Sequence, residues 1–114
     1  MKTPLRIWIT GASSGIGRAC ALALTGAGHR VWASARNLDQ LESLSRETAD
    51  LEGELISHPL DVTAPEQVSA CAKAMVENWG GIDVVIPNAG MGLFNALKEA
   101  PLSAWHTMVE VNVN

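Results

Sequence analysis

The feature that most constrains this 114-residue chain is the glycine-rich stretch from Thr10 to Gly17, which stands between a short apolar run and a helical pattern. Residues 5–9 are rich in β-branched and aromatic side chains, so they predict a strand that ends where the glycines begin. Small and apolar residues then recur at helical spacing from Ile16, and Gly26 and Gly28 predict the end of that helix. Strand, tight turn and helix N-terminus follow in the order that a dinucleotide phosphate site requires.

Each glycine of the stretch has its own expected role. Gly11 lets the chain leave the strand sharply, Gly15 lets the backbone approach a phosphate, and Gly17 lets helix and strand pack closely. The free N–H groups and the positive dipole end of the helix favour a pyrophosphate anion, and Ser13 and Ser14 add hydroxyl donors. The alternative is a Gly-Ser loop that only turns the chain, and the position between strand and helix argues against it.

The rest of the chain repeats the alternation of strand and helix, which predicts an α/β fold with a parallel sheet. Further strands are expected over 31–35, 55–60 and 84–86, and further helices over 38–51, 65–79 and from 101–103 to Asn114. Thr63 or Ala64 is expected near the cap of the second of these helices, with Pro65 in its first turn. Right-handed crossovers place the strands in the order 3-2-1-4, as in a doubly wound Rossmann-type sheet.

This predicted sheet is incomplete, because a doubly wound dinucleotide fold has two halves and only the first is encoded. We expect a single dinucleotide-binding domain over residues 1–114, truncated before the second half. Strand 84–86 would then present an uncovered apolar edge, which favours association. The chain is therefore expected to be a fragment of a longer protein, marginally folded or associating when alone.

Four motifs together bring a family to mind: the stretch Thr10 to Gly17, Asp61-Val62, Asn88-Ala89-Gly90 and Val111-Asn112. With them the chain resembles the short-chain dehydrogenase/reductase family, in its single-domain branch, and the resemblance covers essentially the whole chain. The spacing Thr-Gly-x-x-x-Gly-x-Gly separates this branch from the extended, epimerase-like one. One position departs from the pattern: Pro87 stands where the family usually has Asn, and proline lacks a backbone donor.

The resemblance implies a set of cofactor contacts. Asp61 would accept a hydrogen bond from the adenine amino group and Val62 would supply its backbone, while Asn88, Ala89 and Gly90 would lie beside the ribose. A helix-capping or solvated acid, and an ordinary turn, are the alternatives for these two segments. The cofactor-binding residues expected in all are Thr10, Gly11, Ser13, Ser14, Gly15, Ile16, Gly17, Arg36, Asp61, Val62, Asn88, Ala89 and Gly90.

The choice of cofactor depends on the residue roughly 20 positions after the glycines, where an acid favours NAD and an Arg favours NADP. No acid ends the second predicted strand, and Arg36 offers a planar fork suited to a phosphate. The sequence therefore predicts NADP(H). NAD is the alternative, because Ser14 replaces the basic residue frequent in NADP-preferring members and Asp39 is a nearby acid. Arg36 could instead be a surface charge beside the next helix, but a cation is unfavourable at a helix N-terminus.

The family's catalytic groups are a Tyr, a Lys four residues later, a Ser and an Asn. This chain contains no tyrosine, so only the Asn is carried over, to Asn112, whose role in the family is to hold a water in a proton relay. The resemblance implies an NADP(H)-dependent oxidoreductase of alcohols and ketones, of which this chain is the cofactor-binding portion and inactive alone. A non-catalytic nucleotide-binding module and an interaction fragment are the alternatives.

Composition and charge limit the classes of partner that the chain is expected to bind. A net charge of −4 gives no basic surface for nucleic acid or anionic membranes. No run approaches ~18 apolar residues, and the N-terminus has too short an apolar run for a secretory signal, so a cytoplasmic enzyme is expected. The three histidines show no metal-ligand spacing. A small-molecule alcohol or ketone is the expected partner, with a homo-oligomer or association through the sheet edge.

Overall fold

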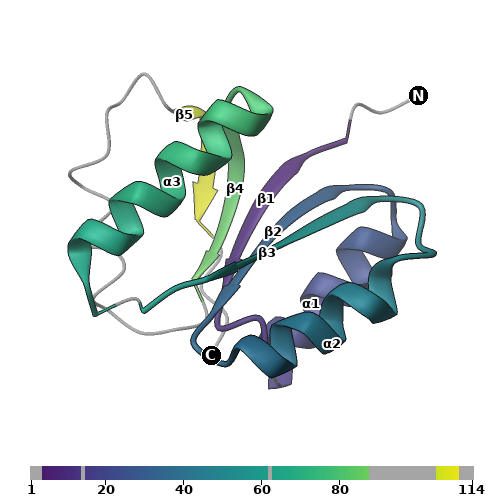
Figure 1. The fold of residues 1–114 in the computed structure, drawn as a ribbon. Helices are drawn as coiled ribbons and strands as arrows, with labels where there is room; N and C mark the ends of the chain where they lie inside the picture. The colour runs from purple at the N-terminus through teal and green to yellow at the C-terminus, as the bar shows by residue number, and fades with distance from the viewer. Residues whose placement is uncertain (1–3, 14, 62, 88–104, 111–114) are drawn as a thin grey trace.

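A computed structural model describes residues 4–13, 15–61 and 63–87, together with the backbone of 105–110. It contains a five-stranded parallel sheet in the order β3-β2-β1-β4-β5, with helices between the first four strands (Figure 1). The elements in chain order are β1 (Arg6–Thr10), α1 (Gly15–Gly26), β2 (Arg30–Ala35), α2 (Leu38–Thr48), β3 (Glu54–Pro59), α3 (Pro65–Trp79), β4 (Ile82–Pro87) and β5 (Trp105–Glu110). The predicted strand order 3-2-1-4 is confirmed.

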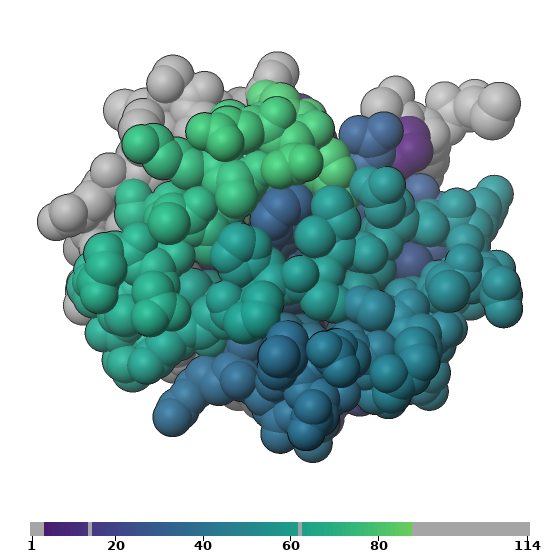
Figure 2. Space-filling model, viewed as in Figure 1, coloured from purple at the N-terminus to yellow at the C-terminus, as the bar shows by residue number. Residues whose placement is uncertain are grey.

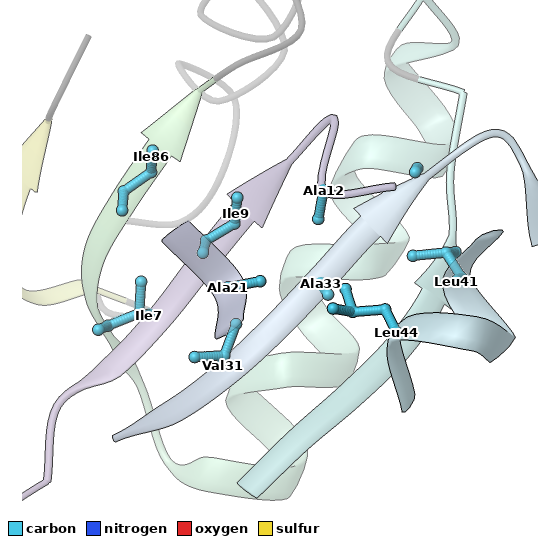
Figure 3. Close-up of a cluster of buried hydrophobic side chains, with 10 residues drawn as sticks. Ile7, Ile9, Ala12, Ala21, Val31, Ala33, Leu41, Leu44 and Ile86 are labelled. Carbon is cyan, nitrogen blue, oxygen red and sulfur yellow. The ribbon is translucent and has the colours of Figure 1, made fainter. Parts of the chain in front are cut away.

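Helices cover both faces of the sheet: α1 and α2 lie on one face and α3 on the other (Figure 1). The core between the sheet and the first pair of helices comprises Ile7, Ile9, Ala12, Ala21, Val31, Ala33, Ala35, Leu41, Leu44 and Ile86 (Figure 3). The core beneath α3 comprises Trp8, Trp32, Leu60, Val68, Cys71, Ala72, Met75, Ile82 and Val85. Since successive side chains of β1 enter opposite cores, the strand is apolar from Ile7 to Ile9, as a parallel strand covered on both faces must be.

The helix ends follow the local chemistry expected of them. Asn37 caps α2, its side chain accepting a hydrogen bond from the backbone N–H of Gln40. Ala64 is the N-cap of α3 and Pro65 follows at the first position, as predicted. Gly80 ends α3 in the left-handed conformation with φ 82°, which glycine adopts without strain.

The prediction of a helix from 101–103 to Asn114 is wrong for residues 105–110, which form β5. This strand pairs in parallel with β4, with a register irregularity between Ile82 and Val84. The free edge of β4 offers a row of backbone donors and acceptors, and the segment Trp105–Glu110 is rich in strand-forming residue types. Pairing at that edge outweighs the local helical pattern. The predicted uncovered edge of β4 is therefore also wrong, since β5 covers it.

The register of the sheet brings the strand ends to one edge. Thr10 lies beside Ser34 on one side and Pro87 on the other, and Ala35 lies beside Pro59. Because the strands are parallel, the segments that follow β1, β2 and β3 leave the sheet at this same edge, where α2 and α3 also begin (Figure 1). Ligands of open α/β sheets bind at this carboxyl edge.

Candidate functional site

The turn after β1 has the backbone that the glycine pattern predicted. Gly11 and Gly15 have φ of 64° and 59°, a region that side chains other than glycine rarely adopt. Between them Ala12 is fully buried, and its N–H donates to the carbonyl of Ser34 at 3.1 Å, which ties the turn to β2. The turn is thus fixed against the sheet and delivers the chain into α1.

The start of α1 is open on its outer side. No atom lies within 4 Å of the position that a Cβ of Gly15 would take. Ile16 is 48% exposed although it is a large apolar side chain, and Ser13 is half-buried. Gly17 is buried against the sheet side of the helix, as its predicted packing role requires. Among the described residues the first turn of α1 is therefore exposed at Gly15 and Ile16, and N–H groups at such a helix start suit a phosphate group.

Asp61 lies where the chain leaves β3 and anchors a tight turn. Its Oδ1 accepts hydrogen bonds from Thr63 twice, from the backbone N–H at 2.9 Å and from the hydroxyl at 2.6 Å. The side-chain bond, the backbone bond and the charge of Arg36 all lower the pKa of Asp61 from its ordinary value. Asp61 is therefore an ionised hydrogen-bond acceptor at neutral pH, and its contact with the adenine amino group stays a prediction.

Arg36 and Asp61 come together at this edge. Both line a hollow of about 250 Å³, whose other lining residues are Pro59, Leu60 and Gln67. Arg36 is exposed, and the part of the chain that the structure describes holds no ion pair of Arg36. Its guanidinium is therefore available to an anion.

The structure also shows where the other polar residues after β2 lie. Asn37, not Arg36, caps α2. Asp39 stands exposed in the first turn of α2, where an acid is favoured by the helix dipole alone. Its position is thus explained without a cofactor, and Arg36 is the residue after β2 that remains free for one.

Gln67 is a residue of this hollow that sequence reasoning missed. Its Oε1 accepts a hydrogen bond from the backbone N–H of Asp61 at 3.1 Å. Gln67 is the third residue of α3, a position from which Gln often reaches back to the backbone before the helix. That signal could have drawn attention to it, although the partner here lies further back than the N-cap.

Several predicted site residues lie outside the described residues: Ser14, Val62, Asn88, Ala89, Gly90 and Asn112. Pro87, the departure from the family pattern, is buried as the last residue of β4 and lies beside Thr10. Thr10 itself is fully buried at the end of β1, directly before the glycine turn.

A larger hollow of about 500 Å³ opens at the opposite edge of the sheet, where Arg6 and Asp83 form an ion pair at 2.9 Å. It lies at the amino ends of β1 and β4, away from the glycine turn, and is not the edge where such sheets bind ligands. Among the described residues no group of His, Cys, Asp and Glu is arranged to hold a metal ion. No helix described in the structure has the length and apolar character needed to cross a membrane.

Comparison with known proteins gives one consistent result. The family model of short chain dehydrogenases matches residues 6–114. Among curated proteins, the chain is 38% identical over 91% of its length to glycine betaine reductase ATRR of Emericella nidulans, of which it covers 8%. It is 37% identical over 92% of its length to dehydrogenase/reductase SDR family member 11 of Gallus gallus, of which it covers 42%. The chain thus spans less than half the length of these relatives.

Solved structures agree with the sequence relatives. A short-chain type dehydrogenase/reductase from Mycobacterium marinum superposes with a TM-score of 0.71 at 41% identity, covering 76% of this chain and 35% of that one. An alcohol dehydrogenase from the archaeon Thermococcus sibiricus superposes with a TM-score of 0.73 at 39% identity, covering 78% of this chain and 38% of that one. Both likenesses hold over the greater part of the present fold.

Proposed function

Because the chain belongs to the short-chain dehydrogenase family, we propose that it is the cofactor-binding portion of an NADP(H)-dependent oxidoreductase. The family is one of oxidoreductases with a nucleotide-binding Rossmann fold, and the substrate proposed here is a small alcohol or ketone. The nicotinamide, when bound, supplies or accepts the hydride that interconverts the two. The residues of this chain bind and orient that group.

The glycine turn supports the proposal of a dinucleotide. Positive φ at Gly11 and Gly15, open space beside Gly15 and a tie from Ala12 to β2 make a rigid, accessible helix N-terminus. First-turn N–H groups and the helix dipole would hold the diphosphate there. The ionised Asp61 would accept a hydrogen bond from the adenine amino group in the hollow that it shares with Arg36.

The observation that carries the choice of NADP(H) is the position of Arg36. Its guanidinium shares a hollow with Asp61, has no ion pair within the described residues, and follows a strand that ends without an acid. Solved relatives do not decide the matter: one of 39% identity is described as complexed with 5-hydroxy-NADP, and an NADH-dependent reductase of 31% identity is complexed with NAD. Arg36 would pair with the 2′-phosphate that only NADP carries.

Catalysis by this chain alone is not part of the proposal. The sequence contains no tyrosine, and Asn112 is the one residue that the family pattern assigns to the proton relay. The alternative to the oxidoreductase is a non-catalytic nucleotide-binding module. The sequence that follows Asn114 in the gene separates the two, since an active reductase needs a Tyr-x-x-x-Lys motif there.

The test is a calorimetric titration of NADP and NAD into the wild-type protein and the variant Arg36→Ala. Loss of a charge-assisted hydrogen bond of about 1.5 to 3 kcal/mol should weaken NADP binding roughly tenfold to 150-fold and leave NAD binding nearly unchanged. The variant Arg46→Ala, an exposed Arg in the last turn of α2, is the matched control and should bind both as the wild type does. Equal losses for the two dinucleotides in Arg36→Ala would refute the assignment of Arg36, and absence of binding to either would refute the function.

A further inference from the structure

Two residues with no role in the proposed function, Thr63 and Gln67, form hydrogen bonds that hold the turn after β3. From one side, Thr63 donates twice to Oδ1 of Asp61, at 2.9 Å and 2.6 Å. From the other side, Gln67 accepts from the backbone N–H of Asp61 at 3.1 Å. Asp61 is therefore bonded through both its backbone and one carboxylate oxygen.

Gln67 reaches this turn from a different element. It stands in the first turn of α3, whose later residues Val68 and Met75 are fully buried against the sheet. The amide oxygen is the group of Gln67 that can accept from an N–H, so this bond also fixes which way the carboxamide faces. Through Gln67 the position of Asp61 is coupled to a rigid helix and not only to its own loop.

The hollow lined by Asp61 and Gln67 has a size that suits one ring system. Its volume of about 250 Å³ is below the roughly 300 Å³ at which pockets begin to hold whole drug-sized ligands. Apolar walls come from Pro59 and Leu60, and the polar groups are Arg36, Asp61 and Gln67. Figure 2 shows the start of α3 at the left and α2 at the bottom of one view, so both helices are visible from this side of the molecule.

We propose that Gln67 is a positioning residue that holds the backbone of Asp61 in place, so that the Asp61 carboxylate, bonded by Thr63, makes the hollow select a 6-aminopurine over a 6-oxopurine. The proposal rests on the proposed binding of an adenine dinucleotide. An ionised carboxylate only accepts hydrogen bonds, so it attracts the 6-amino group of adenine and repels the 6-oxygen of hypoxanthine. Hypoxanthine carries an N1–H donor one atom away, and a carboxylate free to shift could follow that donor. A carboxylate whose Oδ1 is bonded by Thr63, on a backbone held by Gln67, cannot follow it.

The test compares NADP with its hypoxanthine analogue on the full polypeptide that carries these residues. The variant Gln67→Met keeps the length of the side chain but removes the acceptor, and Gln67→Glu keeps the acceptor. The wild type and Gln67→Glu should prefer NADP, whereas the preference in Gln67→Met should fall by roughly two- to tenfold, the range expected for one neutral hydrogen bond. Thr63→Val, which removes the hydroxyl bond to Oδ1, should lower the preference in the same direction and provides the test if Gln67→Met does not fold.

The matched control is Gln40→Met, because Gln40 is an exposed glutamine at the same third position of α2 and does not line the hollow. It should leave the preference for adenine unchanged. A purely structural role of Gln67 would lower the melting temperature and weaken both dinucleotides equally. An unchanged ratio in both Gln67→Met and Thr63→Val therefore overturns the inference while NADP binding persists. Loss of all dinucleotide binding in the wild type overturns the inference together with the proposed function.

Discussion

At the scale of single residues, the glycines of the turn show how a backbone conformation determines a residue type. Gly11 and Gly15 have positive φ, and the space beside Gly15 is open. A side chain at Gly15 is therefore disfavoured by its own backbone and, in the proposed complex, by the ligand, but not by neighbours in the protein.

The variant Gly15→Ala should accordingly lower the free energy of unfolding by about 1 to 2 kcal/mol, the cost of a left-handed conformation for an L-residue. Gly26→Ala is the control: Gly26 ends the same helix, has no positive φ and also has open space around its Cβ position. This control should stabilise the protein by about 0.4 to 1 kcal/mol. Urea unfolding measures both, and a stabilised Gly15→Ala would contradict the strained turn.

The thiol of Cys71 predicts a loss of stability at alkaline pH. Burial raises the pKa of Cys71 above its ordinary value, against smaller opposing effects of hydrogen bonds from Ser34 and Trp32. Its contribution to stability is complete below the ordinary thiol pKa of about 8.5 and is lost as pH rises toward the folded-state pKa, because the unfolded thiol ionises first.

Urea unfolding between pH 7 and pH 10 tests this dependence, and the chain has no tyrosine to ionise in the same range. Cys71→Ala should flatten the alkaline decline, whereas Cys20→Ala, at a half-buried cysteine, should leave it in place. An alkaline decline of full size in Cys71→Ala would assign the effect to other groups.

Single site residues could be predicted from the sequence where they belong to a motif that indicates their role. The positive φ of the glycine turn follows from the glycine spacing, and Arg36 and Asp61, each expected at a strand end, line one hollow; their contacts with a cofactor stay predictions. The position of Gln67 in α3 is a signal in the sequence, but its bond with Asp61 could not be predicted, because that bond depends on how closely the first turn of α3 approaches the end of β3. That distance is set by packing and not by a local pattern.

At the scale of elements, the strands and helices up to Pro87 follow their periodic patterns, whereas the last one does not. The segment 105–110 has apolar residues at helical spacing, yet it is a strand. The segment pairs with β4, which is distant in the sequence, so no pattern within the segment could predict the pairing. Tertiary pairing outweighs propensity at such an edge.

The connection between α2 and β3 should be the least tolerant of added volume. A Cβ on Gly53 would collide with the backbone carbonyl oxygens of His29 and Thr25, and the latter accepts a hydrogen bond from the N–H of Gly53 at 2.8 Å. Gly53→Ala should therefore lower the free energy of unfolding by about 1 to 3 kcal/mol, since backbone atoms cannot move aside as a flexible side chain does. The same urea experiment, again with Gly26→Ala as control, decides this. A neutral Gly53→Ala would show that the loop is free to relax.

At the scale of the whole molecule, the two edges of the sheet have different tasks. At the amino edge, Arg6 donates to Asp83 through Nε and Nη2 and to the carbonyl of Trp79, which joins β1 to β4 and to the end of α3. At the carboxyl edge, Arg36 and Asp61 share a hollow without such an ion pair among the described residues. Arg6 is thus paired within the protein at the amino edge, whereas the guanidinium of Arg36 at the carboxyl edge is available to a ligand.

The order of the strands makes β5 the cover of one sheet edge. Deleting residues 105–114 would leave unpaired the backbone groups of β4 that face β5, which favours pairing with another chain. The shortened protein should show a mean mass that rises with concentration in sedimentation equilibrium, to a greater extent than the 114-residue chain does. Identical behaviour of the two would show that β5 does not protect this edge.

The central claim is that the carboxyl edge, beginning with the glycine turn, binds the nicotinamide dinucleotide. Titration of NADP followed by amide resonances in ¹H–¹⁵N spectra tests it most directly. The account predicts saturable shifts for the backbone amides of Gly11, Gly15 and Gly17 and for those of Arg36 and Asp61, with the amides of Arg6 and Asp83 unmoved. Binding that shifts the amides of Arg6 and Asp83 and leaves the glycine turn unchanged would contradict it.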